Sequence, residues 1–153
     1  MGRRLILDTN VLIDYERGSF DRSSLDDDEL AIAAITVAEY RTGIELADTT
    51  ERAADRARSL AAIEENVEVI DYTPATAVHH ARLIAHVRRT GRSRGAHDLI
   101  IAAHAAQTGR TVLSNDASAR FGDLPGVTAE EPSDLVASPA RRRRMSRRSR
   151  TRT

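Results

Sequence analysis

Four acidic side chains lie where predicted strands end or predicted helices begin in this 153-residue sequence. They are Asp8, Glu39, Asp98 and Asp116. In an open α/β sheet, ligands bind beyond the carboxyl ends of the strands, where the connecting loops converge. Clustered carboxylates repel one another, so such a cluster favours a hard divalent cation that neutralises it. The pattern therefore predicts a site with oxygen ligands for Mg²⁺ or Mn²⁺.

Each of these acids also suits an ordinary structural role. A carboxylate at the start of a helix accepts backbone N–H groups and complements the helix dipole, which fits Asp8, Asp98 and Asp116. Thr36 and Glu39 have the spacing of a capping box. Asp98 is the exception, because it precedes the most apolar helical stretch of a chain without Lys, where a charge near the core needs a partner. From single residues, helix capping and metal binding both stay open.

The elements that position these acids alternate along the chain. Apolar runs predict strands at residues 5–7, 30–35, 67–70 and 111–113. Helical spacing, with Pro74 in a first turn, predicts helices at residues 11–17, 36–46, 49–66, 74–89, 99–106 and 116–121. Strands that alternate with helices imply a parallel sheet covered on both faces. We expect a three-layer α/β/α fold with a central parallel sheet of four to five strands.

Composition narrows the class of protein. The chain has no Cys, which excludes disulfides, Cys-bound metal centres and thiol nucleophiles. No stretch of 18 residues is apolar and uncharged, and the apolar run at the N-terminus is too short for a signal peptide. Five aromatic residues are too few for the stacking platforms of sheet-type single-strand binders. We expect a soluble cytoplasmic protein that does not enter membranes.

The balanced overall charge of 23 Arg and 23 acids conceals two unlike parts. Residues 1–136 hold 15 Arg and all the acids, a net charge of −8, whereas residues 137–153 hold eight Arg and no acid. We expect one domain over residues 1–136 and a disordered Arg-rich tail over residues 137–153. Three interpretations of the tail stay open: an arm that binds nucleic acid, an inert solvated extension, or a non-native extension.

Other polar residues carry weaker signals. No two of the five His have the i, i+4 spacing of a helical metal site, so surface or core positions explain them best. His97, beside Asp98, is a candidate contact to substrate phosphate when it is protonated. Arg92 and Arg94 precede the same acid and are either contacts to the RNA backbone or part of a solvated loop. The Ala-rich helix at residues 49–66 either packs within the fold or receives a helix of a partner.

Four ordered segments extend the argument beyond single residues: ILDTNVLI at 6–13, ITVAEYRTG at 35–43, GAHDLIIAA at 95–103, and VLSND at 112–116 followed by Phe121 and LPGV at 124–127. Over residues 1–130 the chain resembles PIN-domain nucleases, specifically the VapC ribonuclease toxins of toxin–antitoxin pairs. The four acids of that family fall on Asp8, Glu39, Asp98 and Asp116. Ser114 replaces the Thr that relatives often carry two places before the last acid.

The resemblance implies a PIN-like fold, a Mg²⁺-dependent endoribonuclease in which Mn²⁺ substitutes, a homodimer and a cognate antitoxin. It also implies that Asp8 and Asp98 bind the ion directly, while Glu39 and Asp116 act through water, complete a second ion or position the nucleophile. The hydroxyls of Thr9 and Ser114 are candidate partners of these carboxylates, although capping of turns explains them equally well. Two other functions stay open: a housekeeping PIN nuclease in RNA processing, and a non-catalytic RNA-binding or regulatory module.

Overall fold

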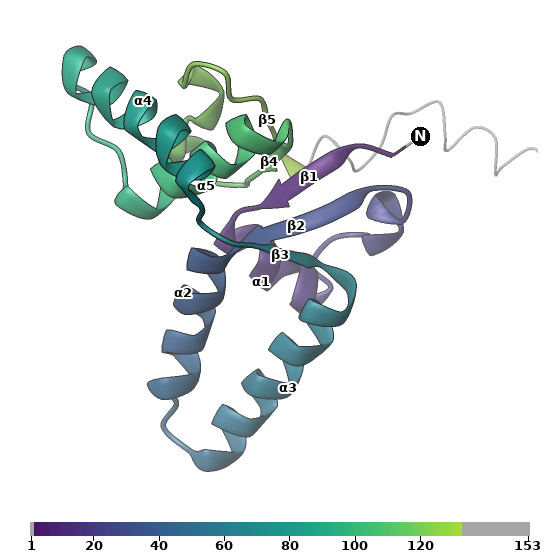
Figure 1. Ribbon diagram of the computed structural model, residues 1–153. Helices are drawn as coiled ribbons and strands as arrows, with labels where there is room; N and C mark the ends of the chain where they lie inside the picture. The colour runs from purple at the N-terminus through teal and green to yellow at the C-terminus, as the bar shows by residue number, and fades with distance from the viewer. Residues whose placement is uncertain (1, 133–153) are drawn as a thin grey trace, which may run out of the picture.

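A five-stranded parallel sheet forms the centre of the computed structural model, which describes residues 2–132 (Figure 1). The strand order is β3-β2-β1-β4-β5, and every neighbouring pair is parallel. The strands are β1 (Arg4–Leu7), β2 (Glu29–Ala33), β3 (Glu68–Ile70), β4 (Thr111–Leu113) and β5 (Ala129–Glu130). The helices are α1 (Thr9–Arg17), α2 (Ala34–Glu45), α3 (Thr50–Asn66), α4 (Pro74–Thr90) and α5 (Ala96–Thr108). The predicted α/β fold with four to five parallel strands is confirmed.

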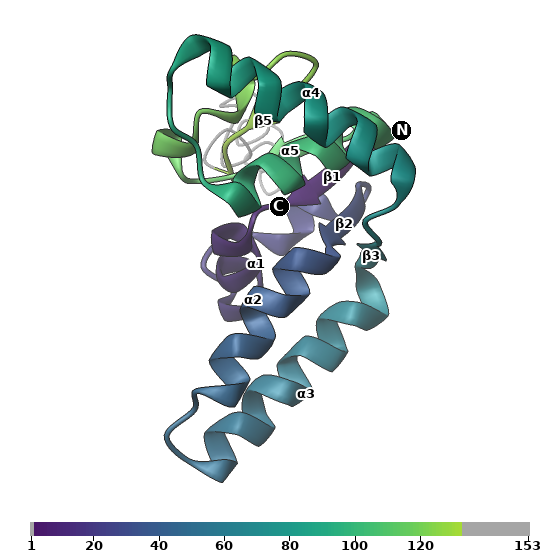
Figure 2. The ribbon, with the colours of Figure 1, turned by 60° about the vertical axis from the view of Figure 1, so that its left-hand side comes forward.

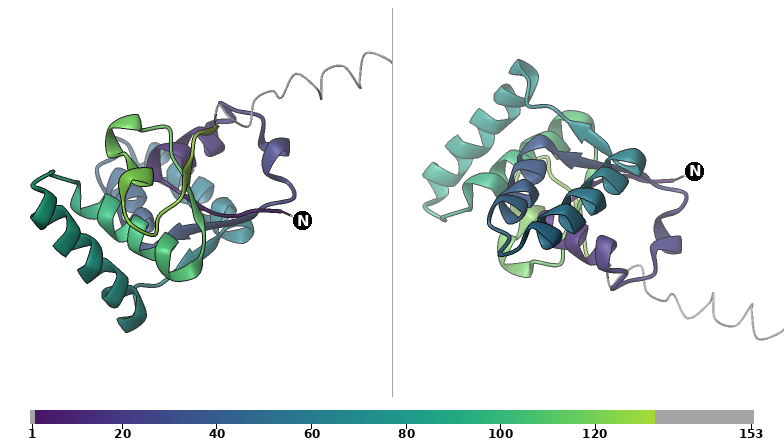
Figure 3. Two further views of the ribbon diagram at one scale, coloured as in Figure 1. Left: turned by 90° about the horizontal axis from the view of Figure 1, so that it is seen from above. Right: turned by 90° about the horizontal axis from the view of Figure 1, so that it is seen from below.

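Alternating side chains of the strands divide the core into two layers. Leu5 and Leu7 of β1 pack with residues of α1 and α3, whereas Ile6 packs with residues of α5 and α4. The views in Figures 1 and 3 show α4 and α5 on one face of the sheet and α1, α2 and α3 on the other. Both faces of the sheet are thus covered by helices, which explains why Leu5, Ile6 and Leu7 of β1 are all fully buried.

Two helices leave the body of the sheet as a hairpin. Helices α2 and α3 pack against each other and extend away from the remaining layers (Figures 1 and 2). Leu46, in the turn region that follows α2, is 78% exposed. On the opposite face, α4 packs along α5, and the Thr76 hydroxyl at the start of α4 donates to Gln107 Oε1 near the end of α5 at 2.6 Å. The two helices therefore run antiparallel, which brings the loop after α4 back to the start of α5.

Several predicted element boundaries differ from the structure by two or three residues, including the start of α1, which lies at Thr9 rather than at residue 11. The second strand ends at Ala33 and α2 begins at Ala34, two residues before the predicted start at Thr36. Helix α5 begins at Ala96 rather than at residue 99. The short helix predicted at residues 116–121 is two 3₁₀ turns, Ala117–Ala119 and Phe121–Asp123, separated by Arg120 in the left-handed region at φ 42°. Helical spacing locates a helix better than its first turn, because the first turn depends on which residue caps it.

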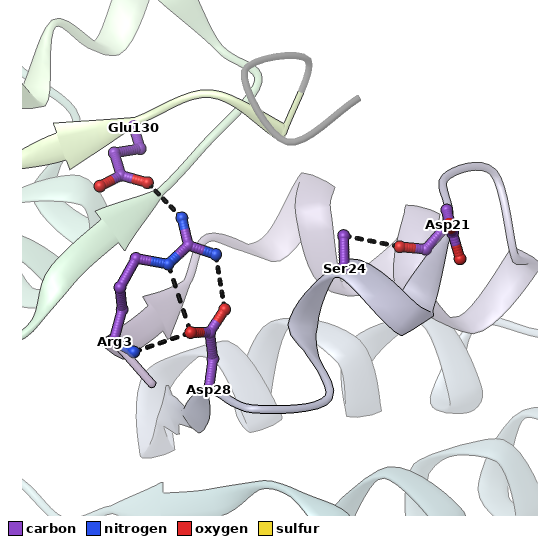
Figure 4. Close-up of polar contacts among 5 residues, drawn as sticks. All are labelled: Arg3, Asp21, Ser24, Asp28 and Glu130. Carbon is purple, nitrogen blue, oxygen red and sulfur yellow. Dashed lines mark hydrogen bonds and ion pairs between the residues drawn. The ribbon is translucent and has the colours of Figure 1, made fainter. Parts of the chain in front are cut away.

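Charged contacts fix the amino-terminal end of β1 to its neighbours. The Arg3 guanidinium pairs with Asp28, immediately before β2, and with Glu130 of β5 at 2.5 and 2.6 Å (Figure 4). Asp28 also accepts from the backbone N–H of Arg3 at 2.7 Å. A nearby 3₁₀ turn, Arg22–Leu25, is held by Asp21, whose carbonyl accepts from the Ser24 hydroxyl. The two ion pairs of Arg3 connect the β2 side of the central strand β1 to β5 on its other side.

Within residues 2–132, no helix has the length and apolar character needed to cross a membrane. The boundary predicted near residue 136 and the Arg-rich tail at residues 137–153 lie outside the described residues.

Candidate active site

The order of the sheet creates a crevice at the carboxyl ends of β1 and β4. From β1 the chain continues to β2 on one side of β1, and it later returns to β4 on the other side. The connections that follow β1 and β4 therefore lead in opposite directions. The backbone N–H of Asp8 donates to the Leu113 carbonyl at 3.0 Å, which places the residue after β1 beside the end of β4. Such a switch point is where open α/β sheets bind their ligands.

Asp8 is the most enclosed of the four acids. It caps α1, accepting from the backbone N–H of Thr9 at 2.8 Å, and only 5% of the residue is exposed. The buried Ser114 hydroxyl donates to Asp8 Oδ2 at 2.9 Å, and its oxygen accepts from the backbone N–H of Asp116 at 3.1 Å. Ser114 therefore links the first and last acids of the set. The candidate partnership between this hydroxyl and a site carboxylate is confirmed.

Glu39 does not serve as a capping residue. Helix α2 begins after Ala33, which makes no side-chain capping bond, so the capping box predicted for Thr36 and Glu39 does not form. The Thr36 hydroxyl is instead buried without a hydrogen-bond partner within the described residues. Glu39 Oε1 lies in the second turn and accepts from the Thr9 hydroxyl at 3.3 Å, with His97 Nδ1 at 3.4 Å. The Glu39 side chain thus points to the N-terminal ends of α1 and α5.

Asp98 also makes no capping bond. It is the third residue of α5, whose N-cap, Gly95, carries no side chain to close the first turn. A Cβ atom at Gly95 would lie 3.0 Å from Asp98 Oδ2, so the glycine leaves room for the carboxylate to fold back over the start of the helix. Asp116, by contrast, caps a 3₁₀ turn and accepts from the backbone N–H and hydroxyl of Ser118 at 3.0 and 2.5 Å.

Repulsion among the acids appears in their protonation equilibria. Burial raises the pKa of the Asp98 carboxyl, and the charges of Asp8, Asp116 and Glu39 raise it further. Burial also raises the pKa of Asp8, against the lowering effect of the Ser114 and Thr9 hydrogen bonds. Hydrogen bonding from Ser118 lowers the pKa of the half-buried Asp116 carboxyl. Because all three other acids act on Asp98, the structure brings the four predicted side chains into one electrostatic cluster.

The chemistry of this cluster fits a hard divalent cation. All four groups supply carboxylate oxygens, which Mg²⁺ and Mn²⁺ prefer, and none of the four forms an ion pair with an Arg of residues 2–132. The positively charged partner, when protonated, is His97 beside Glu39. Within that same range, however, no three acidic or His side chains are already grouped as a metal site. The carboxylates interact, but their rotamers do not converge on a single point.

Sequence reasoning missed two features around the cluster. Asn115 donates from Nδ2 to Asp14 on α1, a contact between segments 101 residues apart that no local pattern announces. Arg94 is not a free loop cation, because its Nη1 donates to the carbonyls of Ala119 and Arg120. Beside Asp116, a hollow of about 470 Å³ extends to Arg120 and Glu131. The neighbourhood of the acids is therefore shaped by contacts between the loops after α4 and β4.

Comparisons with known proteins identify the family of this chain. The PIN domain family matches residues 5–125. Ribonuclease VapC5 of Mycobacterium tuberculosis is 33% identical over 126 residues, covering 82% of this chain and 91% of the relative. The tRNA(fMet)-specific endonuclease VapC of Shigella flexneri is 29% identical over 135 residues, covering 84% and 97%. A crystal structure of VapBC-5 from Mycobacterium tuberculosis, described as a member of the VapBC family of toxin-antitoxin systems, superposes with a TM-score of 0.65 at 30% identity, covering 84% and 96%.

Proposed function

Because this chain belongs to the VapC family of PIN-domain proteins, we propose that it is a Mg²⁺-dependent endoribonuclease and the toxin of a toxin–antitoxin pair. The observation that carries the proposal is that four carboxylates from separate segments interact electrostatically near the switch point, where the charges of three of them raise the pKa of the fourth. Helix capping accounts for Asp8 and Asp116 but not for Glu39 and Asp98, which make no capping bond. A purely structural role therefore leaves Glu39 unexplained and gives Asp98 only its interaction with the dipole of α5.

Each acid has a distinct task in this proposal. Asp8 and Asp98 are the direct ligands, since both are partly or fully buried and both have raised pKa values that a cation would reverse. Glu39 and Asp116 act through water, complete a second ion or position the nucleophile. When bound, the ion supplies an activated water and neutralises charge on the phosphorane-like transition state. We expect side-chain rotations to accompany binding, because the carboxylates interact without already being grouped around one point.

Neighbouring hydroxyls and His97 complete the machinery. Ser114 orients Asp8 while holding the backbone of Asp116, and Thr9 orients Glu39. Such bonds to a ligand carboxylate fix its orientation and limit its motion. His97 is about half exposed and faces Glu39, so its protonated form is placed to meet substrate phosphate. In this proposal the two hydroxyls orient the carboxylates, His97 contacts the phosphate, and the acids bind the ion.

Metal binding by the purified chain tests the site. Titration with Mn²⁺, followed by calorimetry, should give saturable binding that Asp8→Asn and Asp98→Asn each weaken strongly. Asp55→Asn is the matched control, because Asp55 is an exposed acid on α3 paired with Arg58 outside the cluster. Acids that only cap helices would not bind Mn²⁺ as a set, so an unchanged titration in both site variants would favour a non-catalytic RNA-binding or regulatory module.

We also propose that the protein acts in the cytoplasm, where it binds an antitoxin and forms a homodimer with a second copy of the chain. Relatives are known as toxin–antitoxin complexes, and the α2–α3 hairpin presents exposed surface, including Leu46, beyond the sheet. Expression of the chain alone should arrest growth, and co-expression of a short adjacent reading frame should rescue it. Light scattering of the isolated protein should give the mass of a homodimer. Harmless expression of folded, active protein would instead support a housekeeping nuclease.

A further inference from the structure

One long segment of this acidic domain contains no acid. Residues 72–97 hold five Arg and four His, whereas residues 2–132 together carry 15 Arg against 22 acids, a net charge of −7. The segment comprises α4 and the loop that leads into Asp98. An RNA strand that reaches the four site acids meets strong repulsion, so a nearby positive surface matters for binding.

Four of the five Arg in this segment, all except Arg94, make no hydrogen bond or ion pair in the part of the fold that the structure describes. Within residues 2–132, the Arg side chains without a hydrogen bond or ion pair are Arg17, Arg41, Arg82, Arg88, Arg89 and Arg92. Four of these six belong to α4 and the following loop. Arg88 and Arg89 lie in the last turn of α4, where they complement the helix dipole. Arg92 lies beyond the Gly91 cap, so that role does not explain it.

Arg92 lines a cleft of about 300 Å³ at the carboxyl end of α4. The other polar residues of the lining are His86, Thr90, Arg94 and Asp123. Asp123 is the one acid of the lining, and Arg120 Nε lies 3.9 Å from its carboxylate. The cleft therefore offers Arg92 as an unpaired charge, with an imidazole and a second guanidinium beside it.

Arg94 connects this cleft to the acids. Its Nη1 donates to the carbonyls of Ala119 and Arg120, which holds the loop before Asp98 against the segment after Asp116. The Arg94 Nε is buried and has no hydrogen-bond partner within the described residues. Arg92 and Arg94 of the cleft lining precede Asp98 in the chain, and Asp123 and Leu124 of the same lining follow Asp116. A chain of phosphates crossing the acids has this cleft as its neighbouring cationic surface.

We propose that this cleft binds a phosphodiester group of the RNA adjacent to the scissile one, with Arg92 as its principal contact. The inference rests on the proposed function, because it takes RNA as the substrate. A guanidinium donates two parallel N–H bonds to phosphate oxygens, and His86 and Arg94 supply further donors. Contacts of this kind fix the register of the strand without reading its sequence. An acidic segment of a protein partner is a less suitable ligand for this cleft. Unlike an RNA substrate, such a segment has no reason to extend toward the four carboxylates of the nuclease site.

The salt dependence of RNA binding measures this contact. The full chain is titrated in EDTA with a fluorescein-labelled polyuridine RNA of about 20 nucleotides at several salt concentrations. Each phosphate contact to single-stranded RNA contributes about 0.7 to the slope of log K against log salt. Arg92→Gln should therefore lower the slope by about 0.7, and Arg92→Lys should largely restore it. Arg58→Gln, an equal loss of charge on α3 at a residue paired with exposed Asp55, should leave the slope unchanged.

The outcomes separate this inference from the proposed function. Wild-type binding with the same slope in Arg92→Gln overturns the cleft as an RNA site and leaves the nuclease proposal intact. If Arg92→Gln weakens binding of a polyglutamate peptide but not of RNA, the cleft serves an acidic protein segment and the inference is wrong. If the wild-type chain neither binds RNA nor cleaves it with Mg²⁺ or Mn²⁺, both proposals fail. Where cleavage occurs without measurable binding in EDTA, the salt dependence of kcat/KM gives the same comparison of slopes.

Discussion

Ser114→Ala should destabilise the metal-free protein by an amount that depends on pH. The Ser114 hydroxyl donates to the buried Asp8 carboxylate at 2.9 Å and accepts from the backbone N–H of Asp116. A hydrogen bond to a charged group contributes about 1.5 to 3 kcal/mol, so we take about 2 kcal/mol at pH 7. Unfolding entropy of about 2.1 cal/mol/K per residue gives about 0.28 kcal/mol/K for residues 2–132. The Tm should therefore fall by about 7 °C.

The sign of the pH dependence follows from Asp8. Burial raises the pKa of this carboxyl, and the Ser114 hydrogen bond opposes that rise because it favours the ionised form. Removing the hydroxyl raises the pKa further, so the substitution costs most when Asp8 is ionised. At about pH 4, where more of the carboxyl is protonated, the lost bond joins neutral groups and contributes about 1 kcal/mol. The fall in Tm should then be about half of its value at pH 7.

Thermal unfolding in EDTA, followed by circular dichroism at both pH values, gives the comparison. Ser114→Thr keeps the hydroxyl and should remain close to the wild type. Ser118→Ala removes a hydroxyl that also bonds a carboxylate, but at an exposed position, and should lower the Tm by less than about 2 °C. Equal losses of Tm for Ser114→Ala at pH 4 and pH 7 would refute the assigned bond between this hydroxyl and an ionised Asp8.

Two further outcomes follow from the charges. Asp98→Asn should raise the Tm of the metal-free protein at pH 7, because the raised pKa of Asp98 means that its ionisation destabilises the folded state. This destabilisation develops as the pH rises above the ordinary pKa range of Asp and is absent below it. Thermal unfolding in EDTA at pH 4 should therefore show little gain in Tm for the variant. Deletion of residues 137–153 should keep metal-dependent cleavage but lower the salt slope of RNA binding by about 3 if eight Arg neutralise four phosphates. An unchanged slope would identify the tail as inert or non-native.

The positions of the four acids followed from the sequence because parallel strands deliver their carboxyl ends to one edge. Asp8 directly follows a strand that is recognisable as an apolar run, and Asp116 comes three residues after another. Asp98 lies in the first turn of a helix that is recognisable by its apolar stretch at residues 99–103. For Ser114 the sequence left two roles open, a bond to a site carboxylate or the capping of a turn, and the bond to Asp8 forms because β4 lies beside β1. Patterns of period two and period three to four carry this information.

The start of α2 could not be predicted in the same way. Thr36 and Glu39 have the spacing of a capping box, yet the helix begins at Ala34 and the Thr36 hydroxyl is buried. Packing of the first turn against the sheet outweighs a local capping preference that contributes about 1 kcal/mol. The consequence is functional, because Glu39 is freed from capping and accepts from Thr9 instead.

Contacts between distant loops were equally invisible. Arg94 is one of two Arg in a loop of Gly and Ser, and its bonds to Ala119 and Arg120 depend on how two loops meet in space. The left-handed conformation of Arg120, which favours Gly, has no signal in the residue type. Such contacts fix the shape of the cleft beside the acids, so the fold and the acids were readable from sequence while the surrounding surface was not.

Cleavage of RNA by the purified chain tests the central claim, that the four interacting carboxylates form a metal-dependent nuclease site. A panel of RNAs that includes tRNA, the substrate class in the name of one relative, is incubated with the wild type and single variants in Mg²⁺, Mn²⁺ or EDTA. The wild type should cleave only with a divalent ion, and Asp8→Asn and Asp98→Asn should each lower the rate by about 10³-fold or more, equivalent to about 4 kcal/mol of transition-state stabilisation. Asp55→Asn should match the wild type. Cleavage that persists in EDTA, or an unchanged rate in either folded site variant, would contradict the account.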